Sequence, residues 1–433
     1  MGRSWDNLGL FGSGMPMRTW LLPLLLLTGT AFAGTRQSPD TLEVLVFGDP
    51  QPKSATDVDY YRRDIVEPLV GRHHAKLGIS LGDISNDAPE LYPLVKAVDA
   101  KLGVPWLYVP GNHDVDVGAK DDVSSLESFH RAFGKDTYAR REKLATFVVL
   151  DDVIVQPDKK PAYIGGFRED QFAFLESLLP NVPKDRLLVI AVHIPLFEGP
   201  GQHTFRDADR ERLFALLKDF PHVLLLSAHS HTQWQVAHGE KSGWHGANPL
   251  REYNVGAACG AFWSGVKDAA GIPASTMSDG TPNGYAVLTV KAGGEYALAW
   301  HPARDPDAAM ALHGPKVLRK GAYPAWGVYA NVFMGEEDTR VEYRVDGGDW
   351  QPMKKVLQAD PGLLAENMRD DAADALRGYD RSPEATPSTH LWRGALPTGL
   401  EAGEHQVEVR AFDRWRGEQR ARTSYRLQEA ASP

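Results

Sequence analysis

Seven of the side chains between residues 49 and 231 of this 433-residue sequence are candidate metal ligands. They are two carboxylates, two amides and three imidazoles, namely Asp49, Asp83, Gln51, Asn112, His193, His229 and His231. Oxygen and nitrogen donors without a thiolate favour Mn²⁺, Fe or Zn²⁺ and argue against a structural zinc site. Seven donors are too many for one tetrahedral ion but suit two ions that share a bridging carboxylate. Two such ions, about 3.5–4 Å apart, polarise a phosphoryl oxygen and activate water near neutral pH, so these residues predict a dinuclear hydrolytic centre.

The elements that must position these donors are apolar strands that alternate with helical segments. Five predicted strands end directly before a donor or its motif: Leu42–Phe47, Ala75–Leu81, Trp106–Val109, Leu187–Val192 and Val223–Leu226. Helical spacing of apolar residues recurs between them, at Asp57–Val70, Leu91–Leu102 and Asp207–Leu217. Strands alternating with helices predict a layered α/β domain. Functional groups in such folds gather beyond the carboxyl ends of the strands, so five placements of this kind indicate one site.

Five short motifs around these donors follow one another in a fixed order. They are Asp49-Pro50-Gln51, Gly82-Asp83-Ile84-Ser85-Asn86, Gly111-Asn112-His113-Asp114, His193 and Ala228-His229-Ser230-His231. In this order the chain resembles the calcineurin-like metallophosphoesterases, whose motifs are D-x-H, G-D-x-x, G-N-H-D/E, a lone His and G-H-x-H. The Gly111–Asp114 motif matches in full. The resemblance implies a layered sandwich of mixed β-sheets flanked by helices, and a hydrolase that acts on phosphoric ester bonds.

The resemblance also implies a role for each donor. Asp83 is expected to bridge two divalent ions. One ion would be bound by Asp49, Gln51 and His231, and the other by Asn112, His193 and His229.

Two catalytic residues are implied by the same resemblance. His113 is expected to act near the leaving oxygen as a general acid or charge stabiliser, not as a metal ligand. Asp114 is expected to orient and charge that imidazole.

The chain departs from the family pattern at two positions. Gln51 stands where most members have His, and Ala228 replaces a Gly beside the last pair of imidazoles. An amide is a neutral oxygen donor, harder and weaker than imidazole, which shifts the expected preference from Zn²⁺ towards Mn²⁺, with Fe or Zn²⁺ still possible. Some branches of the family carry D-P-Q, so we interpret Gln51 as a variant ligand in a working site.

Later segments resemble the bacterial branch that carries an extra calcineurin-like C-terminal domain. They are Trp263–Gly265, Asp268, Gly271–Pro273, Asp279–Tyr285, Arg377–Arg381 and Ser388–Trp392. We expect a catalytic domain over residues 41–300, a linker over 301–315 and a small β-sandwich over 316–430. The sandwich is predicted from strand-like alternation at Tyr323–Phe333, Thr339–Val345 and Gln406–Phe412.

The N-terminus has the pattern of a secretory signal peptide, predicted over residues 1–33. A short positive region leads into the apolar run Leu21–Leu27 and an A-x-A site at Ala31–Ala33, with residues 1–16 as an upstream extension of a start at Met17. The run is shorter than the roughly 20 residues that cross a bilayer, so no stable membrane anchor is expected. A formal net charge of −10 argues against a nucleic-acid partner. We expect a periplasmic or secreted protein.

The leading hypothesis is therefore an exported metal-dependent phosphoesterase whose partner is a phosphate-ester substrate. One alternative is a phosphoprotein phosphatase of the same superfamily, and another is a non-catalytic metal- or glycan-binding envelope protein. Trp263 and Tyr285 are candidates for a substrate wall, though core packing fits them equally. Five cationic side chains are candidates for phosphate contacts or, more simply, surface charges: Arg62, Arg63, Lys241, Arg251 and Lys267. The sequence assigns neither the substrate nor the oligomeric state.

Overall fold

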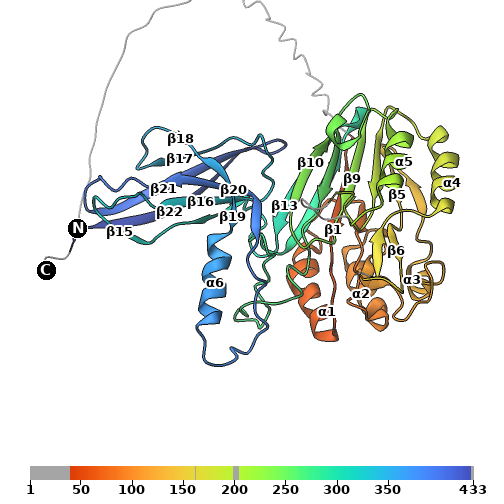
Figure 1. Ribbon diagram of the computed structural model, residues 1–433, viewed down its shortest axis with the longest axis horizontal. Coiled ribbons are helices and arrows are strands. Elements are labelled where there is room, and N and C mark those ends of the chain that lie inside the picture. Colours follow the sequence, from red (N-terminus) through yellow and green to blue (C-terminus); the bar gives the residue numbers. More distant parts are fainter. Residues whose placement is uncertain (1–39, 161, 198–203, 431–433) are drawn as a thin grey trace, which may run out of the picture. The chain divides into compact units, whose positions relative to one another are not determined.

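Two mixed β-sheets carry the predicted donors at the ends of their strands. Figure 1 shows the strands of these sheets as arrows. The computed structural model describes residues 40–160, 162–197 and 204–430, so the predicted signal peptide lies outside the described residues. Within these ranges no helix has the length and apolar character needed to cross a bilayer.

The first sheet has the strand order β13-β12-β1-β2-β3. Strands β1 (Leu42–Phe47), β2 (Leu77–Ser80) and β3 (Trp106–Tyr108) run parallel to one another. Strands β12 (Gly284–Val290) and β13 (Tyr296–Pro302) are antiparallel, with β12 paired to β1. The carboxyl ends of β1, β2 and β3 therefore meet at one edge of the sheet.

The second sheet has the order β10-β11-β9-β8-β5-β4. Its parallel strands are β5 (Ala145–Val149), β8 (Leu187–Ala191), β9 (Val223–Ser227) and β11 (Leu250–Asn254). The outer strands β4 (Tyr138–Arg141) and β10 (Trp234–His238) are antiparallel to their neighbours. This sheet delivers β8 and β9, the two strands that precede the histidine motifs.

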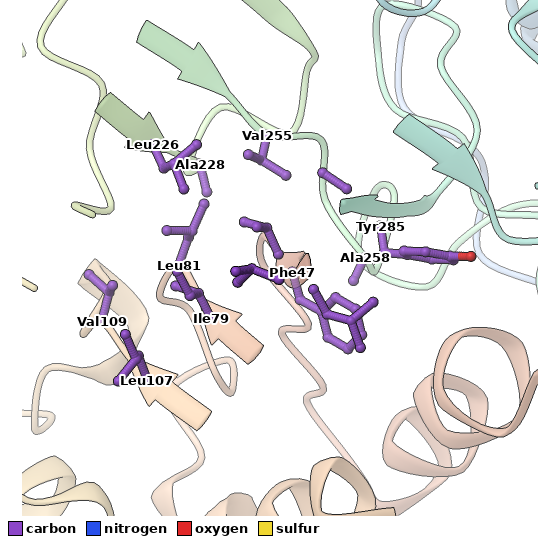
Figure 2. Packing of buried hydrophobic residues seen from close by; sticks show 14 of the residues in the cluster. Phe47, Ile79, Leu81, Leu107, Val109, Leu226, Ala228, Val255, Ala258 and Tyr285 are labelled. Atoms are coloured by element: carbon purple, nitrogen blue, oxygen red, sulfur yellow. The ribbon is translucent and has the colours of Figure 1, made fainter. Parts of the chain in front are cut away.

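Burial on both faces explains why strand β8 is apolar without interruption. Leu187, Val189 and Ala191 of β8 pack in the cluster that contains β1 and β2, whereas Leu188 and Ile190 pack in a second cluster with the helices of the other face. Because both faces of β8 are buried, every position favours an aliphatic side chain. Figure 2 shows members of the first cluster from both sheets, including Ile79 and Leu107 from one and Leu226 from the other.

Helices cover the sheets. Helices α1 (Ala55–Tyr61) and α2 (Tyr92–Asp99) contribute buried side chains to the first cluster, and α4 (Glu169–Leu178) and α5 (Asp207–Leu217) to the second. Helix α1 continues through a π-helical turn, Arg62–Val66, into a 3₁₀ turn, Glu67–Leu69, which accounts for the predicted helical segment Asp57–Val70. Helix α3 (Glu127–Phe133) and the hairpin of β6 (Val153–Val155) and β7 (Tyr163–Gly165) lie in the connections.

Residues beyond β13 form two further sheets with a separate core. One sheet contains β14 (Met310–His313), β16 (Gly327–Val332), β20 (Pro387–Ala395) and β19 (Lys354–Ala359). The other contains β15 (Val317–Arg319), β22 (Gly417–Gln428), β21 (Gly403–Asp413), β17 (Val341–Val345) and β18 (Gln351–Pro352). Val328, Trp392, Val409 and Tyr425 are buried together, and helix α6 (Pro361–Asp371) follows β19. The predicted C-terminal β-sandwich is thus confirmed as a fold. The segment 301–315, expected to be a linker, includes β14, which pairs with β16.

A buried carboxylate, Asp279, connects this sandwich to a donor-bearing loop. Its Oδ2 accepts hydrogen bonds from the Gln233 backbone N–H at 2.8 Å and from His390 Nε2 at 3.2 Å, while Oδ1 accepts from the Thr281 N–H at 2.9 Å. His390 lies on β20, and Gln233 follows His231 by two residues. Asp279 therefore holds the end of the β9 loop against the sandwich.

We predict that Asp279→Ala destabilises the protein by about 3 kcal/mol, because three donors that are satisfied in the folded state would lose their acceptor. Equilibrium urea unfolding, followed by tryptophan fluorescence, measures this loss. Asp349→Ala, at an exposed turn, is the matched control and should change the stability by less than about 0.5 kcal/mol. Equal unfolding midpoints for the two variants would show that the Asp279 hydrogen bonds contribute no net stability.

Candidate metal centre

The seven predicted donors come together where the two sheets meet at the carboxyl ends of their parallel strands. The oxygen donors follow strands of the first sheet and the imidazoles follow strands of the second. Asp83, His193 and His229 offer ligand atoms that all lie within 4.8 Å of one another, and so do Asp49, Asp83 and His231. Asp83 belongs to both groups. This arrangement is the one that two ions with a shared carboxylate require.

Backbone strain is concentrated at the same residues. Five of the seven donors have a positive φ, at 41° for Asp49, 39° for Gln51, 49° for Asp83, 69° for His229 and 46° for His231. Residues other than glycine rarely adopt this conformation. Strain of this kind persists where the surrounding structure enforces it, and it gathers at functional sites.

Two motif glycines allow the loops to approach one another. Gly82 has a φ of 93°, and a Cβ there would lie 2.5 Å from Nδ1 of His193. A Cβ on Gly111 would overlap the backbone nitrogen of Asp83. Ala228, in contrast, is fully buried and has no positive φ, so the methyl group is accepted at this departure from the family pattern.

Hydrogen bonds fix the orientation of two imidazoles. Nδ1 of His193 donates to the Leu81 carbonyl at 2.8 Å, and Nδ1 of His231 donates to the Gly260 carbonyl at 2.8 Å. Each ring therefore presents Nε2 to the other donors: Nε2 of His193 is 3.4 Å from Oδ1 of Asp83, and Nε2 of His231 is 3.9 Å from Oδ1 of Asp49. Backbone acceptors on the far nitrogen are the usual support for a metal-binding histidine.

Burial and the neighbouring carboxylates set the charge of the three imidazoles. Burial lowers the pKa of His229 to about 3 and that of His231 to about 4. Burial alone would also lower the pKa of His193, but the Asp83 and Asp49 carboxylates outweigh it and raise the value to about 10. Burial raises the pKa of Asp49 above its usual range. His229 and His231 are thus neutral near pH 7, the state in which an imidazole binds a metal.

Gln51 has an atom that lacks a partner. Its side chain is 2% exposed, and its Nε2 donates to Oδ2 of Asp83 at 3.2 Å. Its Oε1 is buried and accepts no hydrogen bond among the described residues. A buried carbonyl oxygen without a partner costs about 1–3 kcal/mol. A cation beside Asp49 and Asp83 would satisfy this oxygen, so the residues present fit a metal ion.

The structure corrects the predicted role of Asp114. Its buried carboxylate accepts hydrogen bonds from the backbone N–H groups of Gly111 and Ile84, at 2.9 and 3.1 Å, and from the Tyr92 hydroxyl at 3.0 Å. It joins the β2 and β3 loops, and the expectation that it orients His113 is wrong.

The partner of His113 is Asp87, which the sequence analysis did not single out. Oδ1 of Asp87 lies 3.0 Å from Nδ1 of His113, and the His113 side chain is 31% exposed. The His113 backbone N–H donates to Oδ1 of Asp83 at 2.9 Å, which keeps the imidazole beside the donors. Asp87 lies four residues after Asp83 in the same loop, and this closeness to a predicted donor is the sequence feature that could have identified it.

Most of the candidate substrate contacts interact with other protein groups, whereas Lys241 is exposed. Trp263 is buried and donates from its indole nitrogen to the Pro50 carbonyl at 2.9 Å, and Tyr285 packs in the core near Phe47. Arg62 and Arg63 pair with Asp59 on helix α1 and its continuation, Arg251 pairs with Glu336, and Lys267 lies over the Tyr60 ring. The aromatic side chains that do contact donor imidazoles are Phe262, beside His231, and Tyr163, beside His229.

Comparisons with known proteins match nearly the whole described chain. The family described as calcineurin-like phosphoesterase matches residues 42–233, and the family described as C terminal of calcineurin-like phosphoesterase matches residues 252–418. The chain is 29% identical over 158 residues to a probable glycerophosphodiester phosphodiesterase, GpdQ, of Arcobacter nitrofigilis, covering 35% of this chain and 54% of that protein. It is 31% identical over 98 residues to cell division control protein 1 of Saccharomyces cerevisiae, covering 22% of this chain and 18% of that protein.

The chain thus spans about half the length of the first relative and under a fifth of the second. Among solved structures, a purple acid phosphatase, PPD1, from yellow lupin (Lupinus luteus) seeds aligns with a TM-score of 0.45 and 14% identity over 62% of this chain and 52% of that one. The first family match lies within the first folded part, and the second begins in its strand β11 and continues into the C-terminal sandwich. With its motifs brought together at one site, the chain belongs to the calcineurin-like metallophosphoesterases.

Proposed function

We propose that this protein is an exported phosphoesterase that hydrolyses a phosphate ester at a dinuclear metal centre. The observation that carries the proposal is the pair of donor groups that share Asp83. Export rests on the signal-peptide pattern of residues 1–33. The relative from A. nitrofigilis is named as a probable phosphodiesterase, which favours a phosphodiester among the substrates to be tested.

We assign the donors to two ion positions. Asp49, Gln51 and His231 would hold one ion, Asn112, His193 and His229 the other, and Asp83 both. Two bound divalent ions would polarise the phosphoryl oxygens and lower the pKa of water at the site. Mn²⁺ is the favoured ion because the Gln51 amide oxygen is harder than the imidazole it replaces.

His113 and Asp87 form the proton-transfer pair of this proposal. Asp87 accepts the Nδ1 proton of His113, which leaves Nε2 to carry the proton that moves to the leaving oxygen. The half-exposed position of Asp87 and the partial exposure of His113 let this pair face an incoming ester. Asp87 is a positioning residue, since it acts through His113.

We predict that Asp83→Asn abolishes hydrolysis and lowers the bound metal from two ions towards one or none, because the shared negative charge offsets two dications. The measurement combines metal analysis with turnover of aryl phosphate monoesters, aryl phosphodiesters and a phosphopeptide, after loading with Mn²⁺, Zn²⁺ or Fe²⁺. Asp185→Asn, at an exposed position, is the control.

Three results of that assay would redirect the proposal. Preferential turnover of the phosphopeptide would favour a phosphoprotein phosphatase. Two bound ions with no turnover of any ester would favour a non-catalytic metal-binding protein. Retention of both metal and rate in Asp83→Asn would refute the dinuclear assignment.

We predict that His113→Ala leaves the metal content intact and lowers kcat by about 10²–10⁴-fold for an ester with a poor leaving group. Asp87→Asn should give a smaller loss, about tenfold, with the same dependence on the leaving group. Both losses should shrink for activated aryl esters, which need no proton. Equal losses for poor and activated leaving groups would contradict a general-acid role for His113.

We predict that Gln51→His raises Zn²⁺ affinity at its ion position and reduces the dependence of activity on added Mn²⁺, since imidazole suits Zn²⁺ better than an amide oxygen does. Gln51→Leu keeps much of the side-chain volume but removes Oε1, so it should weaken that ion with either metal. Calorimetric titration of the metal-free proteins measures both effects. Unchanged metal affinities in both variants would remove Gln51 from the ligand set.

A further inference from the structure

An exposed aromatic side chain, Phe262, lies against one of the donor imidazoles. Its ring centroid is 4.6 Å from that of His231, and the two rings are stacked at 28°. Phe262 is nevertheless 46% exposed, so much of its surface faces solvent. A single exposed apolar residue is ordinary on a protein surface, and its placement here needs a second observation.

The backbone supplies that observation. Phe262 and Trp263 have φ values of 56° and 55°, a conformation in which bulky residues are outliers. The turn is enforced by hydrogen bonds from the Trp263 N–H to the Cys259 carbonyl and from the Ser264 N–H to the Ala261 carbonyl, both at 3.1 Å. The Trp263 indole is tied to Pro50, inside the first donor motif. Backbone strain that the surrounding structure enforces is typical of functional sites, so the exposed Phe262 ring is a candidate for a functional role.

A second aromatic ring stands beside the other donor group. Tyr163, on β7, meets His229 edge-on, with ring centroids 6.0 Å apart and an interplanar angle of 84°. His229 belongs with Asp83 and His193, whereas His231 belongs with Asp49 and Asp83. Among the described residues, each of the two donor groups is therefore bordered by an aromatic side chain.

The geometry points to Phe262 as a specificity residue that stacks on a flat ring in the leaving group of the substrate. This inference rests on the proposed function and adds the substrate class, a phosphate ester of an aromatic or heteroaromatic group. The face of a phenyl ring offers no hydrogen bond to a small hydroxyl-rich alcohol, whereas stacking on another ring is favourable. Because the Phe262 ring adjoins His231, a ring placed on it would lie close to a phosphoryl group held at the ion positions.

The test measures the binding of non-hydrolysable phosphonates to the Mn²⁺-loaded protein by calorimetry. Phenylphosphonate should bind about tenfold more tightly than methylphosphonate to the natural sequence. Phe262→Ala and Phe262→Leu should bring the ratio of the phenylphosphonate and methylphosphonate affinities close to one. The methylphosphonate affinity and the metal content should stay unchanged. Phe262→Tyr should keep the ratio, because it keeps the ring. Trp326→Ala, an exposed aromatic on the C-terminal sandwich, is the control and should also keep it.

Three results would overturn the inference. The first is the absence of a preference for phenylphosphonate in the natural sequence, and the second is a preference that survives in both Phe262→Ala and Phe262→Leu. Loss of metal from both variants would also overturn it, since Phe262 would then support His231 and not the substrate. Failure of the proposed function gives a different pattern, in which two ions are bound but neither phosphonate binds and no ester is hydrolysed.

Discussion

The hydrogen bonds around the Asp83 carboxylate are the constraint on which the rest of the site depends. Oδ1 accepts the His113 backbone N–H and Oδ2 accepts the Gln51 amide, while the Asp83 carbonyl accepts the Gln51 backbone N–H. His193 approaches the same carboxylate from the other sheet, and this approach is possible because Gly82 has no Cβ. One side chain thus joins loops from three strands of one sheet to a strand of the other. A shift of Asp83 would move both donor groups together.

Much of the fold was predictable because buried strands have a simple pattern of apolar residues in the sequence. A strand covered on both faces must be apolar throughout, and Leu187–Ala191 is such a run. The segment 301–315 was harder to interpret, because its Pro- and Ala-rich composition resembles a linker. Its strand β14 is stabilised by pairing with β16, a partner that no local pattern reveals.

The donors themselves could be predicted, since each follows a strand in a recognisable motif. Their supporting partners could not. Asp114 is adjacent to His113 in sequence, but the short helical turn they share directs its carboxylate to the β2 loop. Asp87 reaches the imidazole because its backbone has a φ of 54°, which tertiary contacts impose. The left-handed turn at Phe262 and Trp263 is supported by local backbone hydrogen bonds and by one bond to a distant residue, from the Trp263 indole to the Pro50 carbonyl.

The division of donors between the sheets has a consequence for folding. Oxygen ligands come from one layer and imidazoles from the other, so the site exists only when the layers are packed in register. An ion held by donors from both layers would join the two layers, and its binding free energy would add to the stability of the domain. Under the proposed function, the supply of metal would therefore affect the stability of the fold as well as the rate of hydrolysis.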